Sequence, residues 1–176
     1  MKDNHEVLRP ALDLGELSRR KVIWTTISSL PYSSSDDTFI ADDMVVAVCL
    51  KGKVDNHYDM SPVCFRPHDI SVMLPNHIVS GGACSPDYKA LLFVVSRELY
   101  DELIHRDSFR NFHKYRYQPC FHLDDGQFGN VMAIMKVLRI TVDCGHPKRL
   151  DMITDILDVL FYTLASYRTE SRCDAV

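Results

Sequence analysis

The sequence predicts a mainly β protein with helices toward its C-terminal end: a small β-barrel followed by an antiparallel helical hairpin. Residues 44–80 form a run of short apolar strands separated by turns that contain glycine or proline. Near residue 96 the apolar period changes from two to about 3.6. From residue 124 onward, two amphipathic helical stretches are separated by Gly145 and Pro147.

The barrel strands are rich in β-branched and aromatic residues. The expected strands are residues 21–27, 45–50, 61–66, 70–74 and 89–95. Glycine allows positive φ, so Lys51-Gly52 predicts a tight reversal and a returning strand, and Gly81-Gly82 predicts a turn. Pro67 and Pro75 stand at strand ends, where no ladder donor is lost.

Helical signals begin at Ser96, an N-cap residue that predicts a short helix over 96–105. Residues 106–117 mix basic and aromatic side chains; we interpret them as an amphipathic segment whose aromatic edge packs inward, not as a nucleic-acid patch. Residues 119–123 should be extended. Asp124 and Gln127 form a capping-box pattern at the start of the hairpin.

Each arm of the hairpin has an apolar seam with alternating spacings of three and four residues. The second arm has a further apolar stripe displaced around the helix, wider than one packing partner requires. This stripe predicts a homodimer surface made of Met152, Ile156, Val159 and Thr163. The alternative is that both stripes face this chain's own barrel and helical neighbour.

Composition limits the function classes. The 176 residues are 46% hydrophobic, enough for one packed domain, and the net charge of −4 gives no basic footprint for nucleic acid. Six cysteines without a CxxC pattern predict reduced, buried thiols. The N-terminus lacks a signal-peptide core and no segment is apolar enough to span a membrane, so we expect a soluble, cytoplasmic protein without a membrane partner.

The sequence shows no catalytic or metal-binding motif. The segment Asn56–Met60 holds a single histidine, whereas metal-binding barrels use two histidines one residue apart, a carboxylate and a third histidine. GxSxG and phosphate-binding glycine motifs are also missing. We therefore expect no catalytic residues, no metal and no cofactor.

The barrel interior is the remaining candidate site, because a mostly apolar cavity with a few polar or aromatic groups suits a small ligand. Strand alternation places Val46 and Val48 on one face of their strand, and Phe93 on one face of another. The candidate ligand-binding residues are Trp24, Tyr32, Val46, Val48, Tyr58, His77 and Phe93. The alternative is a barrel filled with its own side chains.

The order of features resembles the N-terminal sensor and dimerisation domain of AraC-type bacterial transcription regulators. The resemblance rests on VVAVCLKGKV, then CFRPHDISVMLPNHIV at the position of that family's turns, then KALLFVVSRELYDEL and the helical pair, over residues 20–168. His68 replaces the usual glycine of the family's Pro-Gly-Asp turn. The missing histidine set fits a metal-free sensor.

The resemblance implies a cupin-like (jelly-roll) barrel and a division into four parts. These are an N-terminal arm at 1–18, a barrel at 19–123, a dimerising hairpin at 124–168 and the start of a linker at 169–176. It also implies a small-molecule effector of unknown identity, a homodimer, and contact with DNA only through a C-terminal helix-turn-helix domain not present in this chain.

Two other hypotheses stay open. A metal-independent cupin-type enzyme acting on a sugar or small acid would use Tyr58, His57 or His77 as acid–base groups. A module that only dimerises would have its barrel packed solid by Phe93, Trp24 and neighbouring leucines.

Overall fold

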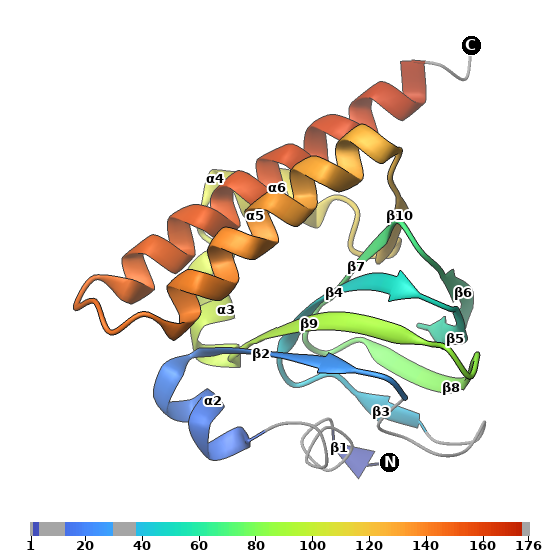
Figure 1. The fold of residues 1–176 in the computed structure, drawn as a ribbon, viewed down its shortest axis with the longest axis horizontal. Coiled ribbons are helices and arrows are strands. Elements are labelled where there is room, and N and C mark those ends of the chain that lie inside the picture. Colours follow the sequence, from blue (N-terminus) through green and yellow to red (C-terminus); the bar gives the residue numbers. More distant parts are fainter. Residues whose placement is uncertain (1, 4–12, 30–37, 174–176) are drawn as a thin grey trace. The chain divides into compact units, whose positions relative to one another are not determined.

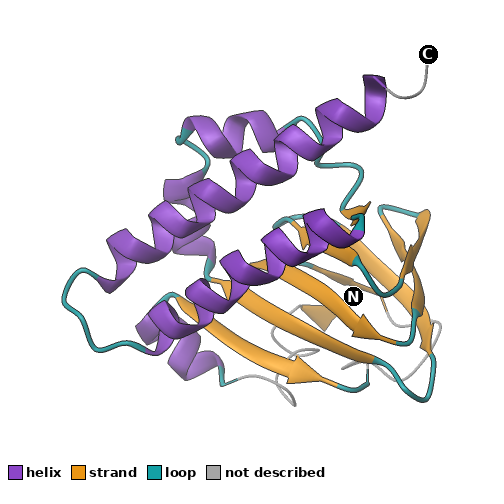
Figure 2. Cartoon of the chain, turned by 45° about the horizontal axis from the view of Figure 1, so that its top comes forward, coloured by secondary structure: helices purple, strands orange, loops and turns teal. Residues whose placement is uncertain are grey.

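The computed structural model describes residues 2–3, 13–29 and 38–173, and the chain divides into two compact units (Figure 1). The first unit consists of residues 1–100 and 117–123, and the second of residues 101–116 and 124–176. The strands lie in the first unit and the two longest helices in the second (Figure 2). None of the helices within the described ranges is long and apolar enough to cross a membrane.

The first unit contains the predicted β-barrel, built in its described part from two five-stranded sheets. One sheet has the order β1 (Lys2–Asp3), β3 (Thr38–Ile40), β8 (Ile78–Cys84), β5 (Val54–Tyr58) and β6 (Ser61–Phe65). The other has the order β10 (Cys120–His122), β7 (Asp69–Met73), β4 (Met44–Lys51), β9 (Lys89–Val95) and β2 (Val22–Ile27). Every pair is antiparallel except β1 with β3.

One face of the β4 sheet carries the main apolar cluster of the barrel. Val45 and Ala47 on β4 share this face with Leu92 and Val94 on β9 and with Ile23 on β2. Successive side chains of a strand point to opposite faces, so Val46, Val48 and Phe93 lie on the other face of the same sheet. These three side chains are also fully buried, so the sheet is apolar on both faces.

The glycines do not all act as predicted. Gly52 has φ of 65°, as a tight reversal requires, but β5 pairs in the other sheet and does not return along β4. The expected turn at Gly81-Gly82 is wrong: β8 runs through both residues. Asn56 faces Gly82 and His57 faces Ser80, which leaves Gly81, with φ of 56°, as the extra residue of a β-bulge.

The segment predicted as an N-terminal arm contains a helix in its described part. Helix α2 (Leu14–Arg20) begins after Asp13, whose side chain accepts a hydrogen bond from the Glu16 N–H at 3.0 Å. This N-cap signal is visible in the sequence and outweighs the polar composition that favoured an arm. Residues 1 and 4–12 lie outside the described part of the chain.

The short helices follow their sequence signals. Helix α3 (Arg97–Leu103) begins in the first unit and ends in the second, and the Ser96 hydroxyl caps it by accepting from the Leu99 N–H at 3.3 Å. Helix α4 (Asp107–His113) buries Phe109 and Phe112 while Arg110 stays exposed and His113 is half-buried, which confirms the amphipathic interpretation. Both aromatic rings contact Phe161, with centroids 5.0 and 5.1 Å away.

The hairpin consists of α5 (Asp125–Asp143) and α6 (Arg149–Cys173), which lie side by side in Figure 1. The predicted capping box is present: Asp124 accepts from the Gln127 N–H at 2.8 Å, and the Gln127 side chain accepts from the Asp124 N–H at 3.2 Å. The second helix continues to Cys173, beyond the expected end at residue 168. No helix-breaking residue occurs between 168 and 173, so the helix has no local reason to stop.

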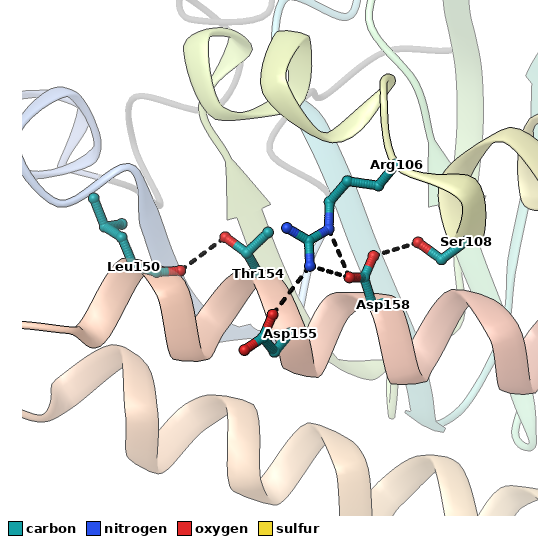
Figure 3. A network of polar contacts seen from close by, with 6 residues as sticks. All are labelled: Arg106, Ser108, Leu150, Thr154, Asp155 and Asp158. Atoms are coloured by element: carbon teal, nitrogen blue, oxygen red, sulfur yellow. Dashed lines mark hydrogen bonds and ion pairs between the residues drawn. The ribbon is translucent and has the colours of Figure 1, made fainter.

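A polar network fastens the start of α4 to α6 (Figure 3). The Arg106 guanidinium donates through Nε to Asp158 at 2.6 Å and through Nη2 to Asp155 at 3.0 Å. The Ser108 hydroxyl donates to the other oxygen of Asp158. These bonds raise the pKa of Arg106, Asp158 most of all, so the guanidinium stays charged.

Candidate functional site

The barrel encloses a mostly apolar cavity of about 80 Å³ between its two sheets. Its walls come from strands of both sheets and from the segment before β10. The lining side chains are Ile27, Phe39, Ala41, Val45, Ala47, Val54, Asn56, Tyr58, Val63, Phe65, Ser71, Met73, Val79, Tyr88, Leu92 and Pro119. An apolar enclosure with a few polar groups is the usual form of a small-molecule site.

The structure brings one of the predicted ligand-binding residues, Tyr58, to the cavity. Val46, Val48 and Phe93 do not line it, because the odd-numbered residues of β4 and the even-numbered residues of β9 face inward. The structure therefore places these three side chains on the face of the sheet opposite the cavity.

The other predicted residues lie elsewhere. Trp24 pairs with Phe93 across β2 and β9 and shares its face. His77 is not among the cavity-lining side chains. Tyr32 falls outside the described residues.

His77 supports Tyr58 from beside the cavity. Its ring stacks on the Tyr58 ring with centroids 5.0 Å apart, and its Nδ1 lies 2.5 Å from an Asp59 carboxylate oxygen. The second oxygen of Asp59 accepts the Ile78 N–H at 2.9 Å. Tyr117 meets the His77 ring edge-on at 6.1 Å. This cluster fixes the orientation of the Tyr58 ring.

Four lining residues carry side-chain polar groups: Asn56, Tyr58, Ser71 and Tyr88. The Tyr58 oxygen accepts the Leu74 N–H at 3.3 Å, and burial raises the pKa of Tyr58, so its hydroxyl stays neutral. Asn56 Oδ1 is different. Among the described residues, this oxygen is the one buried polar side-chain atom that has no hydrogen-bond partner. The sequence contained a signal for this residue, since Asn56 shares strand parity with Val54 and Tyr58.

Of the three residues that the enzyme hypothesis names, Tyr58 lines the cavity, whereas His57 and His77 do not. His57 is exposed on the outer face of β5, and His77 is paired with Asp59 outside the lining. Among the side chains described, no group of three metal-ligating residues comes together. Among the described lining residues the titratable side chains are Tyr58 and Tyr88, and no histidine, lysine, arginine, aspartate or glutamate lies with them.

A wider polar groove adjoins the cavity, because Val63 and Pro119 line both. The groove has a volume of about 660 Å³ and runs along β6 and the segment 117–122. β6 and β10 are edge strands of their sheets, so the groove follows two sheet edges. The shared residues Val63 and Pro119 place this groove next to the cavity.

The second unit carries a different surface on α6. Ile153, Leu157, Leu160 and Leu164 are fully buried and form the packed seam. Of the predicted dimer residues, Met152 and Val159 are exposed, while Ile156 and Thr163 are half-buried, and the Thr163 hydroxyl donates to the Val159 carbonyl at 2.7 Å. Exposed apolar side chains on the two hairpin helices also include Val137, Ile140 and Tyr162.

Comparisons with known proteins find no matching family model and no matching curated protein. Solved structures do match. The AraC-like transcriptional activator CuxR is 13% identical with a TM-score of 0.45, and the match covers 80% of this chain and 48% of CuxR. Apo ToxT K231A from Vibrio cholerae is 8% identical with a TM-score of 0.46, and the match covers 89% of this chain and 58% of ToxT.

A further match is wild-type ToxT from Vibrio cholerae in a structure bound to an unsaturated fatty acid, 10% identical with a TM-score of 0.42; it covers 88% of this chain and 56% of ToxT. The chain thus spans about half the length of the solved structures it matches.

Proposed function

We propose that this chain is the effector-sensing and dimerisation domain of an AraC-type transcription regulator. The observation that carries the proposal is the apolar cavity inside the cupin-like barrel, whose described lining holds four side chains with polar groups and no histidine, lysine, arginine, aspartate or glutamate. Such a cavity suits binding without chemistry. The resemblance of residues 20–168 to the sensor domains of this family points the same way.

The dimer surface in this proposal is the exposed side of α6, formed by Met152, Ile156, Val159 and Thr163. Met152 and Val159 are 41% and 55% exposed. Their apolar surface remains in contact with water although the opposite side of the helix is packed, and such contact is unfavourable. A second copy of the chain would remove them from water. The proposed partners are thus a second copy of the chain and a small effector. DNA would be bound through a C-terminal helix-turn-helix domain outside this chain, and the protein would act in the cytoplasm.

Effector binding would act on the hairpin through connected segments of the chain. Leu92 and Pro119 line the cavity; β9 leads into α3, and the segment 119–123 leads into α5. A ligand that binds one arrangement of these segments better than another shifts their populations. The free energy by which a saturating effector shifts the equilibrium between the two arrangements equals the difference between its binding free energies for them.

The enzyme hypothesis has no observation in its favour, because His57 is exposed and His77 is committed to Asp59. The hypothesis of a solid barrel conflicts with the cavity of about 80 Å³. We therefore retain the non-enzymatic sensor as the proposed function.

A thermal-shift screen of a metabolite library against the full chain tests the sensor part. A ligand at 100 times its Kd should add about 2.7 kcal/mol of apparent stability. Sedimentation velocity tests the dimer part: the wild type should sediment as a dimer and the double variant Met152→Lys, Val159→Lys as a monomer. A library without any stabilising compound contradicts the sensor, and a wild-type monomer at high concentration contradicts the dimer.

A further inference from the structure

We propose that the effector of this barrel is a small uncharged molecule with an apolar body and one hydrogen-bond donor, and that Asn56 is the residue that accepts this donor. The inference rests on the proposed sensor function, since it names the class of ligand that the same cavity selects. Three properties of the cavity carry it: the charge of its wall, the state of Asn56 and its volume.

The charge of the wall excludes ionic ligands. The described residues that line the cavity include no lysine, arginine, histidine, aspartate or glutamate. The hydroxyl of Tyr58 is held neutral by burial and already accepts the Leu74 N–H. A carboxylate or an ammonium group placed here would lose its hydration without gaining a counter-ion, which is strongly unfavourable. The cavity therefore selects against charge.

The state of Asn56 calls for a donor. Its Oδ1 atom is buried and has no hydrogen-bond partner, although a buried acceptor is almost always satisfied. The strand register explains why the protein leaves it open. Asn56 lies opposite Val63 on β6 and opposite Gly82 on β8, and neither of these residues has a side chain that can donate. A ligand N–H or O–H would complete the arrangement.

The volume limits the size of the ligand. An engineered apolar cavity of about 150 Å³ holds benzene. The cavity here measures about 80 Å³, so a five-membered ring is a better match than a six-membered one. Pyrrole is a suitable probe, because it is uncharged, apolar over most of its surface and has one N–H donor.

The experiment compares three probes of similar size on the full chain by ligand-observed NMR titration. Pyrrole donates a hydrogen bond, furan has the same ring shape without a donor, and propionate is an anion. We expect pyrrole to bind a few-fold to about tenfold more tightly than furan, which is the range for one net hydrogen bond, and propionate not to bind. Equal affinities for pyrrole and furan overturn the proposal, because water or a flipped amide would then satisfy Asn56.

The variant Asn56→Leu removes the acceptor at nearly constant volume and should abolish the preference for pyrrole while leaving furan bound. Asn111→Leu makes the same change at an exposed position of α4, outside the cavity, and should keep the preference. The wild-type comparison of the three probes does not depend on how either variant folds.

The outcomes separate this inference from the proposed function. Tightest binding of propionate, or a preference that survives in Asn56→Leu, refutes the ligand class while the sensor function stands. Failure of all three probes also refutes it, whereas the sensor function falls only if the metabolite screen finds no ligand as well.

Discussion

The barrel and the helical hairpin differ in how completely each fills its interior. In the hairpin unit the seam leucines of α6 are fully buried, and the Arg106 network satisfies its polar groups. In the barrel the interior keeps a cavity of about 80 Å³ and an acceptor without a partner on Asn56. Protein interiors are normally close-packed, so the cavity and the unsatisfied acceptor indicate that the barrel is the unit that binds a ligand.

The largest expected effect on the free energy of unfolding comes from the packed seam of the hairpin. Leu157→Ala should destabilise the chain by about 3 kcal/mol, because a filled seam cannot collapse around the lost side chain. Urea unfolding followed by circular dichroism at the helix band measures it. Leu150→Ala, on the same helix but at an exposed position, should change the unfolding free energy by less than about 0.5 kcal/mol. Equal effects of the two variants would mean that the seam is loosely packed.

The next effect contrasts two positions inside the barrel. Ala90 is fully buried and does not line the cavity, so Ala90→Val should cost about 1–3 kcal/mol through overpacking. Ala47 does line the cavity, and Ala47→Val should cost less than about 0.5 kcal/mol because the added methyl groups enter open space. Thermal unfolding of both variants tests the contrast. Equal costs would break the distinction between a filled and an open region of the barrel.

A pH effect of smaller size should be confined to the barrel. Burial, with a smaller effect of Asp69, raises the pKa of Cys49 to about 11 from its ordinary value of 9.0. The folded state therefore holds the thiol proton more tightly, and stability should fall as pH rises from about 9 to about 11, by on the order of 1 kcal/mol. Fluorescence of Trp24, the single tryptophan, reports barrel unfolding. Cys49→Ala should flatten this pH dependence, and an unchanged slope would refute the assignment.

The smallest effect concerns the turn between β5 and β6. Asp59 and Met60 have φ of 47° and 67°, a conformation that costs a methionine about 1 kcal/mol or more. Met60→Gly removes this strain but increases the conformational entropy that the chain loses on folding, so we expect a net stabilisation of about 0.5 kcal/mol. Met60→Ala keeps the strained φ and serves as the control. A gain of equal size in both variants would show that exposure of the methionine, and not the backbone, was responsible.

Much of the fold could be predicted because local signals agree with it. The capping pair Asp124 and Gln127, the N-cap Ser96 and the apolar strand at 89–95 all form as their sequences indicate. The N-cap Asp13 carried an equally clear signal that the polar composition around it obscured. Signals of this kind depend on neighbouring residues, so they can be found without the tertiary structure.

The cavity wall was less predictable, for a reason seen in β4. Val45 to Val48 are all buried, so alternation gives no sign of which parity faces the cavity. In β5 the outward residues are polar, and the inward parity that contains Tyr58 could be read directly. The same parity contains Asn56. Its open acceptor depends on the partners Val63 and Gly82 from other strands, which local sequence does not reveal.

The most direct test of the account is a calorimetric titration of pyrrole, or of a screening hit, into the wild type and into Ala47→Val. If the barrel cavity is the effector site, the filled variant keeps its stability and loses binding by tenfold or more, about 1.4 kcal/mol. Equal affinity for both proteins would contradict the account, because the ligand would then bind outside the cavity.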